Sequence, residues 1–511
     1  MTRKKNQRIK VAGLILSCAI IAACDRNFEN PVGDEDYNSG TADFSKFVTI
    51  GDSLTAGYAD GALYLDGQKN SYPAILAQQF AKVGGGAFNQ PLVSDNLGGL
   101  LFGGVANPDF GNRLVLNAEP KNPPSNLDPK GPEPIAGTPT TEVIGSGLNG
   151  SVFNNMGVPG AKSFHLAAAN YGDATGLGAG TANPYFVRFS SAAGTTMIAD
   201  AAAQQPSFFI LWIGNNDILS YATTGGIGTD QKSNTNPSTY GSNDITDPAA
   251  FAGVYNGLVT ILTPANASAK GVLLNIPDVS TLPYFTTVPY NAVPLDQLNA
   301  EALNNNLYAD YNEGVQTALG GTEEGDAEVI KRKITFTAGQ NAVVIEDDTL
   351  TDLSGVGLAS MRQATATDLL ILTTSSKIGT LANPGNANSA WGLGVPLEDG
   401  DVLIPSEIQA IETARTAFNT TIAAAADADP DLILVDVAAI MNEVKTSGIN
   451  YGTGFIDGTY ATGGTFSLDG VHPTARGYSV VANRIIDKIN SSFGANIPPV
   501  DPGSYSTIFV K

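Results

Sequence analysis

Basic residues are scarce in this sequence: 27 lysines and arginines stand against 49 aspartates and glutamates, giving a formal net charge of −22. A surface of that sign repels phosphate groups, so the composition excludes nucleic acid and other polyanions as partners. We therefore expect a neutral or weakly polar ligand. The acidity itself is interpreted as a solvated surface.

The N-terminal apolar run is too short to cross a bilayer. The run from Val11 to Ile21 falls short of the roughly 20 apolar residues that a transmembrane helix needs. It follows a cluster of basic residues, which is the layout of a secretory signal: Arg3, Lys4, Lys5, Arg8 and Lys10. Residues 1–23 are therefore predicted to be a signal peptide.

Cysteine is nearly absent, with Cys18 inside the predicted signal and Cys24 directly after it. The string Ile21-Ala22-Ala23-Cys24 resembles the lipobox of bacterial lipoproteins. This resemblance implies lipidation of Cys24 and a lipid anchor in the bacterial cell envelope, with the outer membrane, periplasmic or surface-facing, as the expected location. An ordinary cleaved signal is the alternative. Once Cys18 is removed no disulfide can form within one chain, so stability must come from core packing.

The rest of the chain predicts a globular protein, because 42% of its residues are hydrophobic and 15% are charged. Short apolar runs rich in β-branched and aromatic residues predict strands, at 47–50, 151–155, 207–213, 271–275 and 432–436. Helical patterns alternate with them, at 72–80, 249–262 and after Ser406, where Gln409 completes a start signal. This alternation predicts a three-layer α/β sandwich with a mostly parallel central sheet.

Two long insertions interrupt the alternation within a domain that we place at 42–495. Residues 24–41 are polar and acidic and are predicted to be a tether, and 496–511 a C-terminal tail. The first insertion, at about 84–150, is rich in Gly, Pro and Asn and is expected to form loops. The second, at about 320–405, is expected to be β-rich, with a hairpin that pairs 334–337 with 343–345 and a further strand at 369–372. This second insertion either shapes a substrate mouth or is structural decoration.

Two short strings near opposite ends of the chain carry the chemistry. Gly51-Asp52-Ser53-Leu54 places a serine directly after the first predicted strand, and Asp469 lies three residues before His472, one of only two histidines. A serine hydroxyl needs a base to take its proton, and the base needs a third group to fix its tautomer. Ser53, His472 and Asp469 are therefore the candidate nucleophile, base and orienting carboxylate.

These strings resemble the first and fifth sequence blocks of the SGNH, or GDSL, family of serine esterases and lipases. Asn155-Met156-Gly157-Val158-Pro159-Gly160 resembles the second block, and Gly214-Asn215-Asn216-Asp217 the third. The blocks occur in the family's order over residues 51–472, although the long insertions have no counterpart in small members. The resemblance implies a flavodoxin-like three-layer fold.

The resemblance also implies an oxyanion hole, in which Gly160 supplies a backbone N–H and Asn216 a side-chain amide. Together with the N–H of Ser53, these groups would donate to the negative charge that develops in a tetrahedral intermediate. Considered alone, Gly160 could instead be a glycine that permits a turn, and Asn216 a residue whose side chain caps the following helix. The expected activity is hydrolysis of lipid, short acyl or acetylated carbohydrate esters, without a cofactor or metal. The alternatives are a non-catalytic surface-binding lipoprotein that retains the fold, and a lipoprotein whose second insertion docks a partner.

Other patterns in the chain are weaker. A Gly-x-Ser-x-Gly elbow is missing, which argues against an α/β-hydrolase. His165 is interpreted as structural, and the glycine-rich string 145–150 precedes a predicted strand rather than a helix, against nucleotide binding. Asp427, Asp429 and Asp431 lack the glycine and glutamate of an EF-hand loop and are interpreted as a solvated turn. The Trp391 side chain is expected either to pack within the second insertion or to contact substrate.

Overall fold

The computed structural model describes residues 36–122, 126–264 and 268–511. The predicted signal peptide 1–23, the lipidation site Cys24 and most of the predicted tether lie outside these residues. Within them, no helix combines the length and the apolar character that crossing a bilayer requires. Asn38 forms a β-bridge with Asn496, so the first described residues lie beside the start of the predicted C-terminal tail.

Five parallel strands form the central sheet: β1 (Phe47–Gly51), β7 (Asn155–Gly157), β8 (Phe208–Trp212), β9 (Lys270–Leu274) and β16 (Leu432–Val435). Their spatial order is β16-β9-β8-β1-β7, with every neighbouring pair parallel. Numbered along the chain, this is the doubly wound order 2-1-3-4-5. The strand order reverses between β1 and β8, and in such sheets ligands bind outside the carboxyl ends of the strands at that point.

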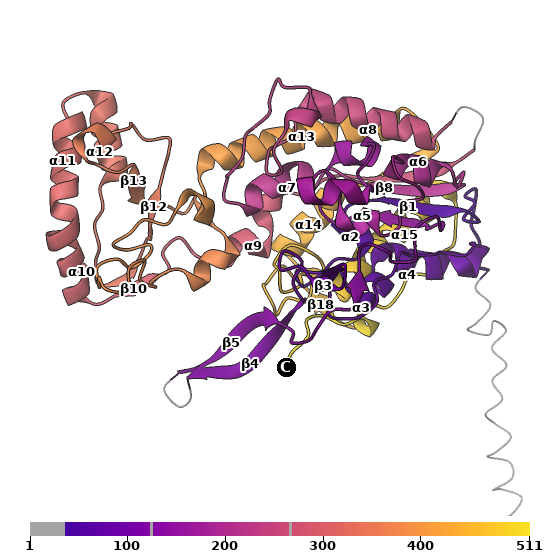
Figure 1. The fold of residues 1–511 in the computed structure, drawn as a ribbon, viewed down its shortest axis with the longest axis horizontal. Coiled ribbons are helices and arrows are strands. Elements are labelled where there is room, and N and C mark those ends of the chain that lie inside the picture. Colours follow the sequence, from indigo (N-terminus) through magenta and orange to yellow (C-terminus); the bar gives the residue numbers. More distant parts are fainter. Residues whose placement is uncertain (1–35, 123–125, 265–267) are drawn as a thin grey trace, which may run out of the picture.

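Helices cover both faces of the sheet (Figure 1). α8 (Pro248–Leu262) and α13 (Pro405–Asp427) pack together over one face, and α4 (Tyr72–Phe80) and α15 (Ala475–Phe493) over the other. Residues of β1 and β8 are buried throughout because both sheet faces are covered. The predicted α/β class with a parallel central sheet is confirmed.

Stacked aromatic rings pack the helices against their neighbours. Phe44 stacks on Phe80 of α4 with ring centroids 4.0 Å apart, and Phe251 of α8 stacks on Phe418 of α13 at 4.1 Å. Burying each such ring contributes about 1.5–3 kcal/mol, and each favourable ring pair adds about 0.5–1.5 kcal/mol. These contacts hold the helices in fixed positions relative to the strand ends.

Helix α13 begins two residues earlier than the start expected from Ser406 as cap and Gln409. Pro405 occupies the first turn, and the Glu407 side chain accepts the N–H of Ile404 at 2.8 Å. Proline suits the first helical position because its missing N–H would have no partner there. The predicted start signal was therefore wrong, although the expected apolar stripe is buried at Ile411, Phe418 and Ile422.

The first insertion is not made of loops throughout. Short strands β2 (Leu100–Phe102), β3 (Val105–Ala106) and β6 (Thr141–Glu142) pair in a small sheet. β4 (Leu114–Asn122) and β5 (Asn126–Pro134) form an antiparallel hairpin that projects from the body (Figure 1). Prolines inside these strands hide them from sequence patterns, yet proline is tolerated in edge strands because an edge need not donate to a neighbour.

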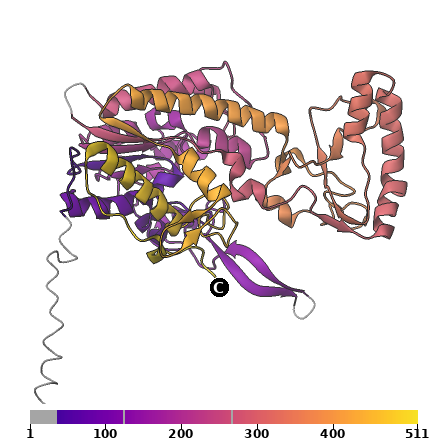
Figure 2. The same ribbon diagram turned by 180° about the vertical axis from the view of Figure 1, so that it is seen from behind.

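Residues 288–404 form a separate lobe beside the sheet domain (Figures 1 and 2). Most of its buried hydrophobic residues gather in two clusters of their own, whereas Ile371 and Leu403 belong to the main core. Helices α10 (Gln297–Leu303), α11 (Ala309–Leu319) and α12 (Glu323–Arg332) form much of it. The lobe thus begins upstream of the expected boundary at 320, and it is a mixture of helices and short strands rather than β-rich.

The hairpin expected inside this lobe does not form. Ile334 and Phe336 lie outside strands, because the side chain of Asn312 bonds both backbone groups of Ile334 and that of Asn304 both of Phe336. The second expected partner lies largely in β12 (Val344–Glu346), which pairs with β13 (Met361–Gln363). The further strand is present as β14 (Leu369–Leu370), paired with β15 (Val402–Leu403).

The C-terminal segment packs against the first insertion. After α15 it contains a short 3-10 helix at Pro502–Ser504. Leu116 of β4 and Val510 form a parallel bridge, and Lys511 makes an ion pair with Glu133 of β5. The end of the chain therefore lies at the base of the projecting hairpin.

Candidate active site

Ser53 lies at the carboxyl end of β1, where α2 (Ser53–Ala56) begins. The carboxylate of Asp52 caps this helix by accepting the N–H of Leu54 at 2.9 Å. Gly51 permits the tight turn: a Cβ at this position would lie 2.3 Å from the carbonyl oxygen of Trp212. The turn leaves the Ser53 side chain at the sheet edge, with 6% of the residue exposed.

His472 lies beside Ser53 although 419 positions separate them in the chain. Its Nε2 is 2.9 Å from the Ser53 Oγ, and its Nδ1 is 2.9 Å from Asp469 Oδ2. The segment is a turn that precedes α15, whose cap is Thr474. The structure therefore brings the three sequence-predicted side chains into one hydrogen-bonded chain.

Asp469 is held as an anion. Its Oδ1 accepts the N–H groups of Val471 at 2.9 Å and of His472 at 2.8 Å. Burial by itself would raise the pKa of Asp469, but the His472 imidazole and these backbone donors outweigh it and bring the pKa to about 2. An ionised carboxylate fixes the imidazole tautomer that leaves Nε2 free to accept the serine proton.

A loop from the first part of the chain completes the support of Asp469, and sequence reasoning missed it. The N–H of Gly61 donates to Asp469 Oδ2 at 2.9 Å. Asp60, at φ +54°, accepts the N–H of Leu468 at 3.0 Å and donates its own N–H to Ser467 at 2.8 Å. The Asp-Gly pair was a recognisable turn signal. Its partner 408 residues away gave no signal in the sequence.

Asp52, adjacent to the serine, is fully buried and lacks a cationic partner among the described residues. Asn215, which follows β8, donates its amide to Asp52 Oδ2 at 3.0 Å. Burial raises the pKa of Asp52 to about 6, against the lowering effect of the bonds from Asn215 and Leu54. This bond joins the ends of β1 and β8 beneath the nucleophile.

The two expected oxyanion residues are joined to each other through the loop after β7. Gly51 of β1 is in register with Gly157 of β7, so Gly160 follows β7 on the side where Ser53 follows β1. The amide of Asn216 donates to the carbonyl of Ala161 at 3.0 Å, and the carboxylate of Asp217 accepts both the N–H and the hydroxyl of Ser163, at 2.8 and 2.6 Å. The residues after β8 thus fix the Gly160 loop.

The backbone donors expected for an oxyanion hole are available. Among the described residues, neither the N–H of Ser53 nor that of Gly160 has an acceptor. Gly160 is exposed and has φ +79°, a left-handed conformation that favours glycine. Asn216 is 8% exposed, and its bond to Ala161 uses one of two amide hydrogens, which leaves the second for a ligand.

A narrow apolar cavity of about 50 Å³ opens beside Ser53 and His472. We call it the serine cavity. Its wall comes from segments after β1, β8, β9 and β16 and from the His472 turn. Besides Ser53, His472 and Asn215, it is lined by Leu54, Trp212, Leu219, Pro277, Val279, Leu282, Val437, Met441, Phe466, Val471, Pro473 and Val481.

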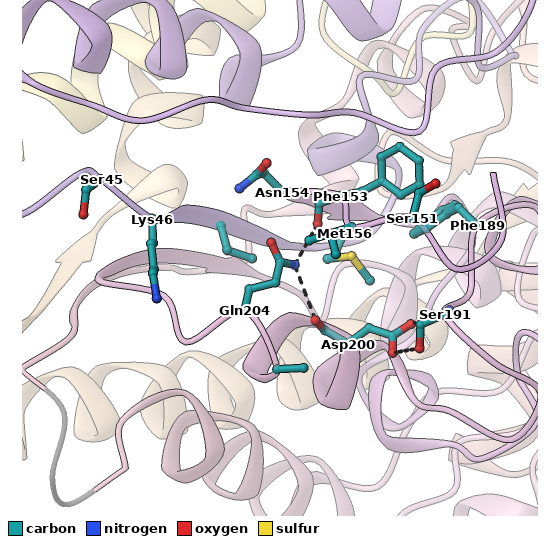
Figure 3. A pocket seen from close by; sticks show the side chains of 13 residues that line it. Ser45, Lys46, Ser151, Phe153, Asn154, Met156, Phe189, Ser191, Asp200 and Gln204 are labelled. Atoms are coloured by element: carbon teal, nitrogen blue, oxygen red, sulfur yellow. Dashed lines mark hydrogen bonds between the residues drawn. The ribbon is translucent and has the colours of Figure 1, made fainter.

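A larger pocket lies near the amino ends of β1 and β7 and has a different chemistry (Figure 3). Figure 3 shows the Gln204 amide between the backbone carbonyls of Phe153 and Asp200, to which it donates at 2.8 and 3.4 Å. The Asp200 carboxylate turns toward Ser191, whose N–H and hydroxyl it accepts. Gln204 and Asp200 thus have partners within the pocket wall, and neither histidine is among the lining residues.

The remaining sequence candidates lie away from this chemistry. His165 stacks on Tyr171 with ring centroids 4.4 Å apart and accepts the N–H of Lys162, and burial lowers its pKa to about 4. Asp431 pairs with Lys270 of β9. The string 145–150 contains no helix. Within the part of the chain that the structure describes, no three His, Cys, Asp or Glu side chains gather in a possible metal site.

Trp391 lies in the lobe, where the Lys377 ammonium sits 4.1 Å from its ring centroid. It packs against the second hydrophobic cluster and is not part of the serine cavity.

Comparison of the whole chain with models of protein families, with curated proteins and with solved structures gives no match.

Proposed function

We propose that this chain is a serine-dependent carboxylic ester hydrolase of the SGNH, or GDSL, type. The observation that carries the proposal is the chain of 2.9 Å contacts from Ser53 to His472 to Asp469. Backbone donors without acceptors at Ser53 and Gly160 support it, since an oxyanion hole needs donors that the protein itself does not satisfy.

The proposed reaction has two halves. Ser53 Oγ attacks the ester carbonyl while His472 Nε2 takes the hydroxyl proton, and the oxyanion receives hydrogen bonds from Ser53, Gly160 and Asn216. Collapse breaks the bond to the alcohol, which leaves with the proton from His472. Water then attacks the acyl-enzyme and gives a proton to the same nitrogen; collapse breaks the bond to Ser53 Oγ, which takes that proton back from His472 as the acid is released. Asp469 stays ionised throughout and stabilises the imidazolium.

The proposed substrates are lipid, short acyl or acetylated carbohydrate esters, and the reaction as written needs no cofactor. If Cys24 is lipidated, the enzyme acts from the bacterial envelope, tethered by the residues that precede Asp36. The alternative is a surface-binding lipoprotein that retains the fold without turnover. An unsatisfied pair of N–H donors beside a hydrogen-bonded serine and histidine favours the enzyme, because a binding scaffold has no need of them.

Labelling by a fluorophosphonate, followed by hydrolysis of simple acyl esters, tests the proposal. Wild-type protein should be labelled and active, and Ser53→Ala should lose both properties. Ser242→Ala, at an exposed loop serine, is the matched control and should behave as wild type. Equal labelling of wild type and Ser53→Ala, or hydrolysis of no ester by the wild type, would overturn the proposal in favour of a binding protein.

A further inference from the structure

The serine cavity lies where it can receive one of the two groups attached to the carbonyl carbon of an ester, because it is on the opposite side of β1 from Gly160. Gly160 follows β7, which lies on one side of β1 in the sheet. The cavity lies on the other side, with walls from residues after β8, β9 and β16, including Leu219, Val279 and Val437. With the carbonyl oxygen directed at Gly160, a group attached to the carbonyl carbon can extend toward the cavity.

The chemistry of the wall fits a hydrocarbon chain. Apart from Ser53, His472 and Asn215 at the reacting end, the side chains that line the cavity are aliphatic, proline, methionine, phenylalanine or tryptophan. Such a wall offers a sugar hydroxyl few partners, and burying an unpaired hydroxyl is unfavourable. The apolar wall would remove each methylene of an acyl chain from water, and each buried methylene would strengthen binding about fourfold.

The size of the cavity limits how long that chain can be. One water-sized group needs roughly 10–15 Å³ of this kind of space, and the cavity provides about 50 Å³. It therefore holds about four carbon atoms beyond the carbonyl by the same measure. A longer chain would have to displace side chains or remain in water.

Two side chains line both the serine cavity and a second cavity and form the partition between them. Met441 of α14 (Val437–Thr446) and Phe466 line the serine cavity and also a second cavity of about 390 Å³. This second cavity extends past Val444 and Phe455. Phe466 is buried, but Met441 is half-buried and unbranched, so its side chain can be shortened with little strain.

We propose that the serine cavity is the acyl-chain site, that it selects esters of straight acyl chains of about four to six carbons, and that Met441 sets the upper limit. This inference rests on the proposed ester hydrolase function and names its substrate class. The alcohol then lies outside the cavity, at the open side of the serine.

Two ester series run with the full-length chain in detergent test the assignment. In p-nitrophenyl esters of increasing acyl length, kcat/KM should rise by up to about fourfold per methylene to a maximum near four to six carbons, then fall at least about tenfold by ten carbons. In acetates of alcohols of increasing length, kcat/KM should change little. A maximum that follows the alcohol, or no dependence on acyl length, would overturn the assignment.

Substitutions at the two ends of the cavity make the test specific. Met441→Ala should open the partition and move the maximum at least two carbons longer, whereas Met361→Ala, at a half-buried methionine of the lobe, should leave the profile as in wild type. Leu219→Trp, at a half-buried site on α7 (Asn216–Thr223), should reduce butyrate hydrolysis at least about tenfold and acetate hydrolysis less than about threefold, since a filled cavity excludes only longer chains.

The failures of the two proposals are distinguishable. If wild-type protein hydrolyses no ester and Ser53 is not labelled, the ester hydrolase function fails. If esters are hydrolysed but Met441→Ala has the wild-type profile, only the acyl-site inference is wrong.

Discussion

Buried carboxylates at the sheet edge near Ser53 and in the lobe have different partners. In the lobe, Arg362 donates to Asp347 at 2.5 Å and to both oxygens of Asp368 at 2.7 Å. Burial pushes the pKa of Asp347 upward, but hydrogen bonds from Thr349, Arg362 and Lys331 outweigh it and bring the pKa to about 2. At the sheet edge near Ser53, Asp52 has neutral donors, and burial raises its pKa to about 6.

The difference shows how one residue type serves two purposes. In the lobe, paired charges join β12 and β13 to the segment that carries Asp368. At the sheet edge, carboxylates receive backbone and amide donors, so their charge remains available to the histidine beside them. Substitutions in the two regions separate these purposes when turnover and stability are measured in the same variants.

Asp469→Asn should have the largest effect, and on turnover alone. The amide would present a donor to His472 Nδ1 and stabilise the tautomer that cannot accept the serine proton, lowering kcat by about 10⁴-fold. Thermal unfolding followed by circular dichroism should stay within a few degrees of wild type. Asp427→Asn, an exposed residue at the end of α13, is the control. Turnover within tenfold of wild type in Asp469→Asn would contradict the assigned role.

Arg362→Met should affect stability and leave turnover near wild type at low temperature. It removes one partner from a buried network and leaves Asp347 and Asp368 unpaired, which costs about 3–5 kcal/mol. Urea unfolding with hydrogen exchange resolved to the lobe measures this loss. Lys130→Met breaks the exposed ion pair with Glu119 and should have no measurable effect. Unchanged exchange in the lobe of Arg362→Met would show that the network is not stabilising.

Asn216→Ala and Asn215→Ala compare neighbouring amides with different partners. Loss of the Asn216 donor should lower kcat by about 10²–10³-fold, since an oxyanion-hole donor acts mainly in the transition state. The Asn215 amide bonds Asp52 instead, so its loss should lower kcat less than about tenfold by the same reasoning. Steady-state kinetics on one ester decide the comparison. Equal losses in the two variants would remove Asn216 from the oxyanion hole.

Glu407→Gln should produce the smallest effect, and only at alkaline pH. Burial, with the nearby charges of Asp399, Asp348 and Asp347, raises the Glu407 pKa from its ordinary value of 4.5 to about 8. The folded state therefore binds the proton more tightly than the unfolded state, so stability falls as pH rises from 4.5 to 8. Glutamine retains an acceptor for Ile404 and avoids this loss.

The Tm of Glu407→Gln should exceed that of wild type by roughly 2–4 °C at pH 8.5 and match it at pH 4.5. Differential scanning at the two pH values is the measurement. Glu412→Gln, on an exposed face of the same helix, has a cationic partner in Arg415 and should not reproduce the pH-dependent gain. A gain of equal size at both pH values would show that ionisation is not its cause.

Local sequence patterns were sufficient for most of the sheet and for the triad. Continuous apolar runs identified four of the five central strands because parallel strands are buried on both faces. The fifth, β7, was expected at 151–155 but forms at Asn155–Gly157, which is not a continuous apolar run. Ser53, Asp469 and His472 were found because each lies in a short string beside a strand end or a helix start. Where a feature depends on neighbouring residues in the chain, the sequence contains the information.

Contacts between distant segments account for what was missed. The bond from Gly61 to Asp469 and the amide clamps of Asn304 and Asn312 each depend on a partner that only the folded chain supplies. The projecting hairpin was missed because prolines interrupt the alternation typical of a strand. The helices of the lobe were missed because polar residues weaken the helical spacing of their apolar residues. The early start of α13 depended on Pro405 and Glu407 rather than on Ser406.

The separation of 419 positions between Ser53 and His472 also has a consequence for how activity arises during folding. Closing so long a loop is entropically costly and forms among the most non-local contacts of the chain. A growing polypeptide carries its nucleophile almost from the beginning but receives its base only near the end of synthesis. Hydrolytic activity would therefore appear late and all at once, which makes turnover a measure of completed folding.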